Sequence, residues 1–179
     1  MHQHEIVKDV RHWLDTFVIE LNLCPFAKRE LMNEAVKFVV SDASTEEMLL
    51  ADLQQELLNL QEDSAIETTL LIHPYVLQAF DDYNQFLDIV DALLDEEGLL
   101  GVYQVASFHP NYRFAETAEG DAENYSNRSP YPILHLLRES SLEREIARHQ
   151  DTSLIPERNI RLLRELGTAK LQALLQRTD

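Results

Sequence analysis

Short apolar runs with strand character alternate with long amphipathic segments over the first 108 residues. Three runs are rich in apolar and β-branched side chains, over residues 35–40, 66–72 and 101–108. The segments between them, 44–62 and 80–97, repeat apolar residues at helical spacing. Such alternation is typical of crossover units, whose strands run parallel. We therefore predict an α/β fold with a small three-stranded, mainly parallel sheet flanked by helices.

Both ends of the chain are predicted to be helical. Apolar periodicity predicts a helix over about residues 5–23, and Pro25 is placed to begin a short second helix. Residues 111–132 are polar but contain four aromatic side chains, and we predict a long ordered loop there. Residues 133–179 are predicted to form a helical tail with a break at Gly167. At 179 residues, the whole chain suits a single domain.

Negative charge is concentrated in the middle of the chain. The formal net charge is −17, and residues 41–123 hold 19 acidic side chains against one basic side chain, Arg113. An acidic surface repels phosphate backbones. We therefore expect neither nucleic acid nor an anionic membrane as a partner.

The cysteine content and the hydropathy pattern favour a cytoplasmic chain. The single cysteine, Cys24, excludes an internal disulfide framework and is typical of a reducing compartment. No run approaches the roughly 18 consecutive apolar residues of a membrane span, and we expect no secretory signal. The amphipathic tail is expected to pack on its own domain or on a second subunit of a homo-oligomer.

His73 and His109 have the clearest link to chemistry. Each follows a predicted strand and precedes a proline, which ends the strand and keeps the histidine backbone extended. Ligands of open parallel sheets bind beyond the carboxyl ends of the strands, so both imidazoles are expected at one edge. Imidazole exchanges protons near neutral pH and binds divalent transition metals. We predict catalytic groups or metal ligands; the alternative is that each histidine caps its strand with a hydrogen bond.

Cys24 is the third predicted catalytic residue. If Pro25 begins a helix, the thiol lies at the helix N-terminus, where the dipole together with Lys28 and Arg29 favours a thiolate. The thiolate would act as a nucleophile or as a further metal ligand. The alternative is that Cys24 is a small buried apolar side chain.

Polar side chains of the long loop are predicted to bind the substrate. Arg113, four residues past His109, has a guanidinium that can hold a carboxylate or phosphate with two hydrogen bonds. Alternatively, Arg113 pairs with a nearby carboxylate and only holds the loop. Three further substrate-binding candidates are Asn124, Asn127 and Arg128.

His135 follows the loop. A short helix is predicted over residues 133–139, and on it the imidazole lies near the polar edge, facing either the site or water. No role follows for His135 from its position alone.

Common nucleotide-binding and hydrolase motifs are absent. The sequence contains no G-x-G-x-x-G, G-x-x-x-x-G-K-[ST], H-E-x-x-H or G-x-S-x-G pattern, and only four glycines. A Rossmann dinucleotide enzyme, a P-loop enzyme and a serine hydrolase of the common fold are therefore not expected.

Three longer phrases carry a resemblance. They are LNLCPFA at residues 21–27, FHPNYRF at residues 108–114 and NRSPYPILHLLRE at residues 127–139. With them, nearly the whole chain resembles a family of uncharacterised bacterial proteins, catalogued as a domain of unknown function. The resemblance implies a bacterial single-domain protein and supplies no catalytic mechanism.

Two functions follow as hypotheses. In the first, the chain is an enzyme or metal-dependent protein that acts on a small anionic molecule at the carboxyl edge of the sheet, with a divalent transition metal as cofactor. In the second, it is a non-catalytic adaptor or small-ligand-binding protein that uses its acidic surface and long loop.

Overall fold

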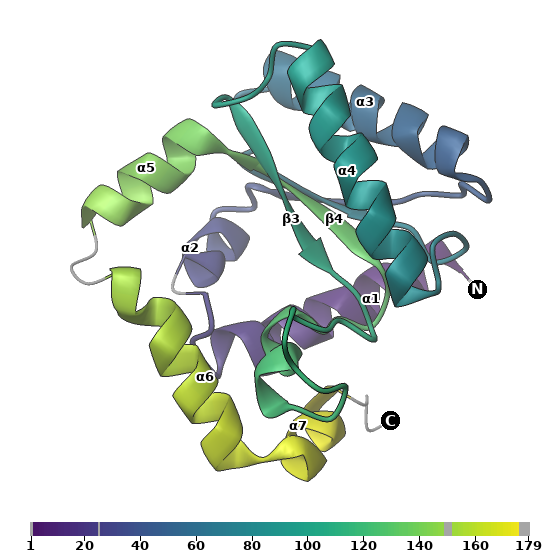
Figure 1. Cartoon of the computed structure of the whole chain (residues 1–179). Helices are drawn as coiled ribbons and strands as arrows, with labels where there is room; N and C mark the ends of the chain where they lie inside the picture. The colour runs from purple at the N-terminus through teal and green to yellow at the C-terminus, as the bar shows by residue number, and fades with distance from the viewer. Residues whose placement is uncertain (1, 25, 149–151, 176–179) are drawn as a thin grey trace.

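The computed structural model describes residues 2–24, 26–148 and 152–175, which form a sheet enclosed by helices (Figure 1). The helices are α1 (Gln3–Trp13), α2 (Ala27–Met32), α3 (Glu46–Glu62), α4 (Phe80–Glu96), α5 (Glu139–Arg148), α6 (Ile155–Leu166) and α7 (Thr168–Leu175). A π-helical segment, η1 (Leu14–Ile19), continues α1, and two 3₁₀ segments are η2 (Ala122–Asn127) and η3 (Thr152–Leu154). The strands are β1 (Val36–Val40), β2 (Thr68–Ile72), β3 (Tyr103–Phe108) and β4 (Ile133–Arg138).

The described sheet has four strands in the order β1-β2-β4-β3. β1 and β2 pair in parallel, whereas β4 pairs antiparallel with both β2 and β3. β1, β2 and β3 therefore run in one direction, as the crossovers through α3 and α4 predicted, and β4 runs against them. The α/β class is confirmed. The prediction of three strands in a mainly parallel sheet was wrong, because it omitted β4.

The fourth strand lies where a helix was predicted. Ile133, Leu134 and Leu136 of β4 are fully buried, because a central strand with helices on both faces needs apolar side chains on both sides. The result is a short, leucine-rich apolar run, which periodicity alone does not distinguish from a buried helix. The helical tail consequently begins at Glu139 and not at residue 133.

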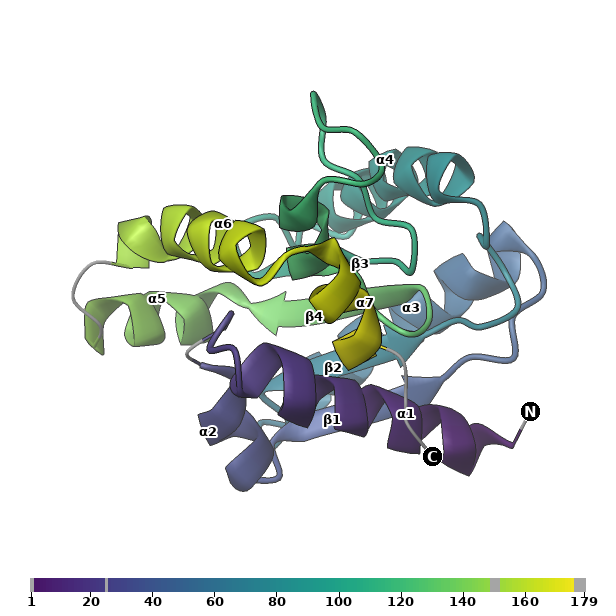
Figure 2. The same ribbon diagram turned by 90° about the horizontal axis from the view of Figure 1, so that it is seen from below.

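The sheet separates two apolar cores. Helices α3 and α4 cover one face, and α1, η1 and α2 cover the other (Figures 1 and 2). Leu71 and Leu134 belong to the core under α3 and α4, whereas Leu70 and Ile133 belong to the core under α1. Neighbouring strand residues alternate between the cores because successive side chains of a strand point to opposite faces.

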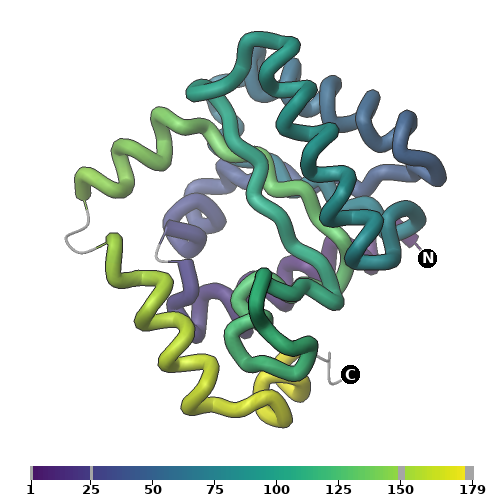
Figure 3. Tube along the Cα trace, in the orientation of Figure 1, coloured from purple at the N-terminus to yellow at the C-terminus, as the bar shows by residue number. Residues whose placement is uncertain are grey.

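The C-terminal helices close the α1 side of the molecule. α6 and α7 lie beside η2, and α7 also contacts η1 (Figure 3). Leu163 and Leu171 are fully buried in the same core as α1. Gly167 separates α6 from α7 with a φ of +76°, a conformation that glycine adopts readily. The predicted break is confirmed, and the described tail packs on its own domain.

Tyr83 of α4 links the end of β3 to the start of β4. This link lies at the edge of the sheet where β2 and β3 have their carboxyl ends. Its hydroxyl donates to the carbonyl of Ile133 at 2.8 Å and accepts from the backbone N–H of Phe108 at 3.1 Å. The tyrosine is fully buried, and burial raises the pKa of its hydroxyl. The phenol therefore stays protonated and holds the start of β4 beside the end of β3.

Replacement of Tyr83 by phenylalanine removes this link. We expect Tyr83→Phe to lower the free energy of unfolding by about 1–3 kcal/mol, because two backbone groups lose a buried partner. Urea-induced unfolding measures the change, with Tyr75→Phe, a tyrosine that is 44% exposed, as the matched control. A loss below about 0.5 kcal/mol, the range of ordinary surface substitutions, would contradict the role.

Candidate functional site

His73 and His109 lie at the same edge of the sheet. Ile72 at the end of β2 and Phe108 at the end of β3 both pair with Ile133 of β4, so the two histidines follow at equivalent positions. Both are fully buried. The ring of Tyr83 contacts both imidazoles, with centroid distances of 5.7 Å to His73 and 5.1 Å to His109.

The hydrogen bonds of the two imidazoles go to the backbone. His73 Nδ1 lies 3.1 Å from the carbonyl of Val76, and His109 Nε2 lies 3.2 Å from that of Leu77. His109 Nδ1 accepts from the backbone N–H of Asn111 at 3.0 Å, so its Nε2 carries the proton. Burial lowers the pKa of both histidines, that of His73 to about 4. Both rings are therefore neutral near neutral pH.

These hydrogen bonds to backbone groups are the ones expected if each histidine caps its strand, which was the alternative to a catalytic or metal-binding role. Both ring nitrogens of His109 are occupied, so neither offers a lone pair to a metal ion. His73 Nε2 is buried without a hydrogen-bond partner among the described residues. Within the described ranges, no group of three or more His, Cys, Asp or Glu side chains is placed to hold a metal. The arrangement does not fit a metal centre, and the catalytic roles of His73 and His109 stay predictions.

The two loop arginines hold the loop itself. Arg113 lies 3.9 Å from the carboxylate of Asp81, in an exposed ion pair, as the structural alternative predicted. Arg128 donates to the carbonyls of Tyr112 and Glu119 at 3.3 and 2.6 Å. Its guanidinium also lies over an aromatic ring, 4.4 Å from the centroid of Tyr125.

The two loop asparagines, Asn124 and Asn127, also form hydrogen bonds to backbone groups. Asn124 is fully buried, and its Oδ1 accepts from the backbone N–H of Phe114 at 3.0 Å while its Nδ2 donates to the carbonyl of Ala118 at 2.8 Å. Asn127 donates from Nδ2 to the carbonyl of Ser107 at 3.0 Å. These polar side chains thus bond to the backbone of the loop and of β3. That residues 111–132 form an ordered loop stays a prediction. Substrate binding by the four loop residues stays a prediction.

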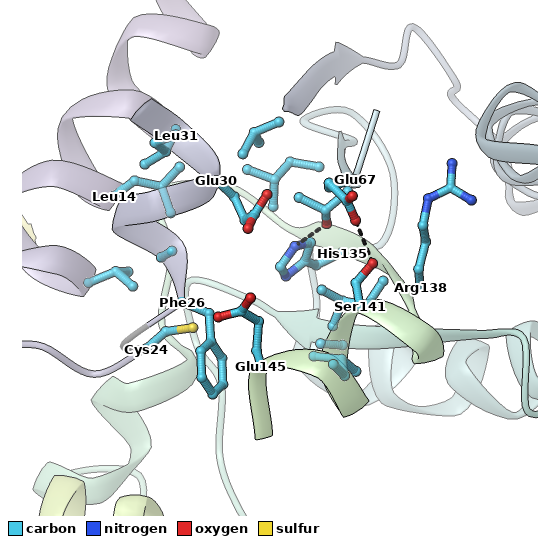
Figure 4. A pocket seen from close by; sticks show the side chains of 18 of the residues that line it. Leu14, Cys24, Phe26, Glu30, Leu31, Glu67, His135, Arg138, Ser141 and Glu145 are labelled. Carbon is cyan, nitrogen blue, oxygen red and sulfur yellow. Dashed lines mark hydrogen bonds between the residues drawn. The ribbon is translucent and has the colours of Figure 1, made fainter. Parts of the chain in front are cut away.

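A cavity of about 240 Å³ lies on the other face of the sheet, between the strands and the helices α2 and α5 (Figure 4). We call it the sheet-face cavity. Its apolar floor comes from all four described strands: Val36, Leu70, Ala106, Phe108 and Leu137. Trp13 and Leu14, where α1 passes into η1, form one wall. The cavity lies away from the carboxyl edge at which the sequence placed the site.

His135 brings an imidazole into this cavity. It pairs with Leu70 of β2 and Ala106 of β3, in the centre of the sheet. The hydroxyl of Thr68 donates to the carbonyl of Leu136 at 2.6 Å, so it accepts from His135 Nε2, also at 2.6 Å. His135 Nδ1 is then a lone-pair acceptor, and no hydrogen bond reaches it within the described chain. Burial lowers the pKa of His135 to about 4.

Three carboxylates border the same cavity (Figure 4). Glu145 of α5 pairs with Arg29 at 2.5 Å and with Arg148 at 2.6 Å. Glu67 accepts from Ser141 and lies 3.5 Å from Arg144. These two carboxylates therefore have partners from the walls of the cavity.

Glu30 of α2 is the third carboxylate. Burial, followed by the charge of nearby Glu67, raises its pKa. The charges of Arg29 and Arg144 oppose this rise, but no hydrogen bond or ion pair within the described residues reaches the Glu30 carboxylate. Its carboxylate and the His135 imidazole point toward the same space (Figure 4).

Cys24 also lines the sheet-face cavity, but not as a helix cap. The N-cap of α2 is Phe26, and Pro25, the predicted start of that helix, lies outside the described residues. Burial raises the pKa of the Cys24 thiol and outweighs the backbone N–H groups of Phe26 and Ala27, which lower it. The expected stabilisation of a thiolate was wrong, because desolvation is the larger effect.

Cys24 and Asn127, a predicted substrate-binding residue of the long loop, both line a second cavity. This cavity measures about 470 Å³ and lies between η2 and α6. Phe108 and Val18 border both cavities. Of the predicted site residues, the structure thus brings together His73 with His109, and Cys24 with Asn127. Asn127 also contacts His109, because its backbone carbonyl accepts from the backbone N–H of His109 at 3.1 Å.

Trp13 is the aromatic side chain between α1 and the sheet-face cavity. The tryptophan lines the cavity and is 2% exposed. Its indole N–H has no hydrogen-bond partner among the described residues, as is also true of Thr69 Oγ1 and His73 Nε2. These three atoms have almost no accessible surface, so they are enclosed by the protein and do not open into the cavity.

Sequence reasoning missed most of the cavity. Its polar residues come from segments far apart in the chain and share no spacing: Trp13, Glu30, Glu67, Thr68, Ser141 and Glu145. One signal was present. His135 is the only polar residue in the apolar run of residues 133–137, and a strand interpretation of that run would have placed it inside the protein.

The fold and the cavity define this chain as an α/β protein with a ligand-sized cavity on one face of a mixed sheet. The chain belongs to the family described as Protein of unknown function (DUF1415), which it matches over residues 5–173. The expected membership of a family of unknown function is thereby confirmed. Comparisons with curated proteins and with solved structures found no match. No helix in the described part of the chain has the length and apolar character needed to cross a membrane.

The neutral buried imidazoles predict acid sensitivity. Burial holds the pKa of His73 at about 4, below the value of about 6.5 for an unfolded imidazole, so the unfolded chain binds protons first as the pH falls. Stability is complete above about pH 6.5 and declines toward pH 4, with a loss of about 2 kcal/mol at pH 5 from His73.

Urea unfolding at neutral pH and at about pH 5 measures this dependence. We expect His73→Gln to be less stable than the parent at neutral pH but to lose less stability on acidification. His12→Asn, which replaces an exposed histidine, is the control. An unchanged pH dependence in His73→Gln would show that this imidazole does not titrate between the two states as described.

Proposed function

We propose that this chain binds a small molecule in the sheet-face cavity. The observation that carries the proposal is a hydrogen-bond acceptor left open in an apolar cavity, His135 Nδ1. Polar groups inside a protein normally have partners. An occupant that presents a donor would satisfy this atom.

The size and lining of the cavity support a small organic molecule. An apolar cavity of about 150 Å³ is enough to hold benzene, and the sheet-face cavity measures about 240 Å³. Ligand sites are typically apolar, with a few polar groups that orient the ligand. The apolar floor of this cavity suits the body of such a ligand, and His135 with Glu30 suits its polar end.

The carboxyl edge, at the ends of β2 and β3, supports ligand binding less well than the sheet-face cavity does. There His109 has both ring nitrogens bonded, and Arg128 and Asn124 are bonded to the loop backbone. A catalytic or metal-dependent activity at that edge would require these bonds to break. Enzymatic action on a small anionic molecule therefore remains a hypothesis without support from this geometry.

The adaptor hypothesis rests on the acidic middle of the chain and on the long loop. Solvated faces of α3 and α4 explain those carboxylates without a partner protein.

A cytoplasmic location, inferred from the single cysteine, suits a small-ligand-binding protein.

Trp13 makes the proposal directly testable, because it is the only tryptophan in the chain and lines the cavity. We expect titration with 1-hexanol to change its fluorescence in a saturable way. We expect Ala106→Phe, which fills the floor of the cavity, to weaken this binding by at least about tenfold while leaving the protein folded.

Ala51→Phe is the matched control, since Ala51 is exposed on α3. Circular dichroism and thermal unfolding establish that both variants are folded. Binding of the same strength in folded Ala106→Phe would locate the ligand elsewhere and contradict the proposal.

A further inference from the structure

We propose that the ligand of the sheet-face cavity is a small amine, with its ammonium group between Glu30 and His135 and its apolar body on the floor of the sheet. This inference rests on the proposed function and specifies the chemical class of the ligand. It differs from the anionic molecule that the sequence suggested.

The argument begins with the carboxylates. Glu145 is paired with Arg29 and Arg148, and Glu67 with Ser141 and Arg144. Glu30 has no such partner within the described residues. A half-buried carboxylate is stabilised by an opposite charge within a few ångströms. Burial raises the pKa of Glu30 and the charges of Arg29 and Arg144 oppose this rise, but neither arginine forms an ion pair with it among the described residues. The position directly against the Glu30 carboxylate, inside the cavity, is therefore open to a cation (Figure 4).

His135 adds a second acceptor in the same space. Its Nε2–H is used by Thr68, which leaves the lone pair of Nδ1 toward the cavity. An ammonium group has three donors and no acceptor. It can therefore donate to Glu30 and to His135 at once, whereas a carboxylate or phosphate would face two acceptors.

Among the described residues, no arginine near the cavity is free to attract an anionic ligand instead of an amine. Arg29 and Arg144 are committed to Glu145 and Glu67. Arg138 extends away from the cavity (Figure 4) and donates to the carbonyls of Leu60 and Ile66. An anionic ligand would have to displace one of these pairs.

Three ligands with the same alkyl chain test the proposal: n-hexylamine, 1-hexanol and hexanoate. Titrations at neutral pH are followed by Trp13 fluorescence and by calorimetry. We expect hexylamine to bind at least about tenfold more tightly than hexanol, because its hydrogen bonds are charge-assisted, and hexanoate to bind most weakly. This comparison needs no variant and so does not depend on whether a variant folds.

Glu30→Gln supplies the second arm. We expect it to reduce the affinity for hexylamine to about that for hexanol, by about tenfold, and to leave hexanol binding unchanged. Glu143→Gln, an exposed carboxylate on α5, controls for the general loss of negative charge. Equal loss of hexylamine affinity in both variants would mean that the ammonium does not contact Glu30.

The outcomes separate the two proposals. If hexanol or hexanoate binds as tightly as hexylamine, the cavity binds ligands but the amine inference is wrong. If none of the three ligands produces saturable binding, both the amine inference and the proposed function fail.

Discussion

β4 hydrogen-bonds to β2 on one side and to β3 on the other, with Leu134 opposite both Leu71 and Ser107. This antiparallel pairing places residues 133–138 in the centre of the sheet, where alternate side chains must enter opposite cores. Leu134 and Leu136 enter the core under α3 and α4. His135 must then face α1 and α2, and the sheet-face cavity receives its imidazole for this reason.

The two groups of buried polar side chains differ in where their open atoms lie. At the carboxyl edge, Tyr83, His109 and Asn124 are bonded to backbone groups that they hold in place, and the unbonded Nε2 of His73 is enclosed by the protein. Hydrogen bonds of this kind rigidify the structure around them. In the sheet-face cavity, His135 Nδ1 keeps an open lone pair among the described residues. An open atom that lines a cavity favours a ligand, whereas bonded or enclosed atoms favour a structural role.

The segments that resemble the family meet at this cavity, although they are far apart in the chain. Cys24 and Phe26 come from the first phrase, Phe108 from the second and His135 from the third, and all four line the cavity. The third phrase is also held to the first helix, since the hydroxyl of Tyr131 donates to Asp9 at 2.8 Å. The phrases therefore build one region of the fold.

The sequence by itself determined the α/β class, the direction of three strands and the common edge of His73 and His109. Local periodicity and the proline after each histidine encode these features. Only the tertiary structure decided the strand character of residues 133–138, because burial on both faces removes the alternation that marks a strand. It also decided the ionisation of Cys24, where desolvation exceeds the local effect of backbone N–H groups. The sheet-face cavity depends on the tertiary structure in the same way. Its polar residues become neighbours only when β4 is inserted into the sheet and α2 and α5 pack beside it.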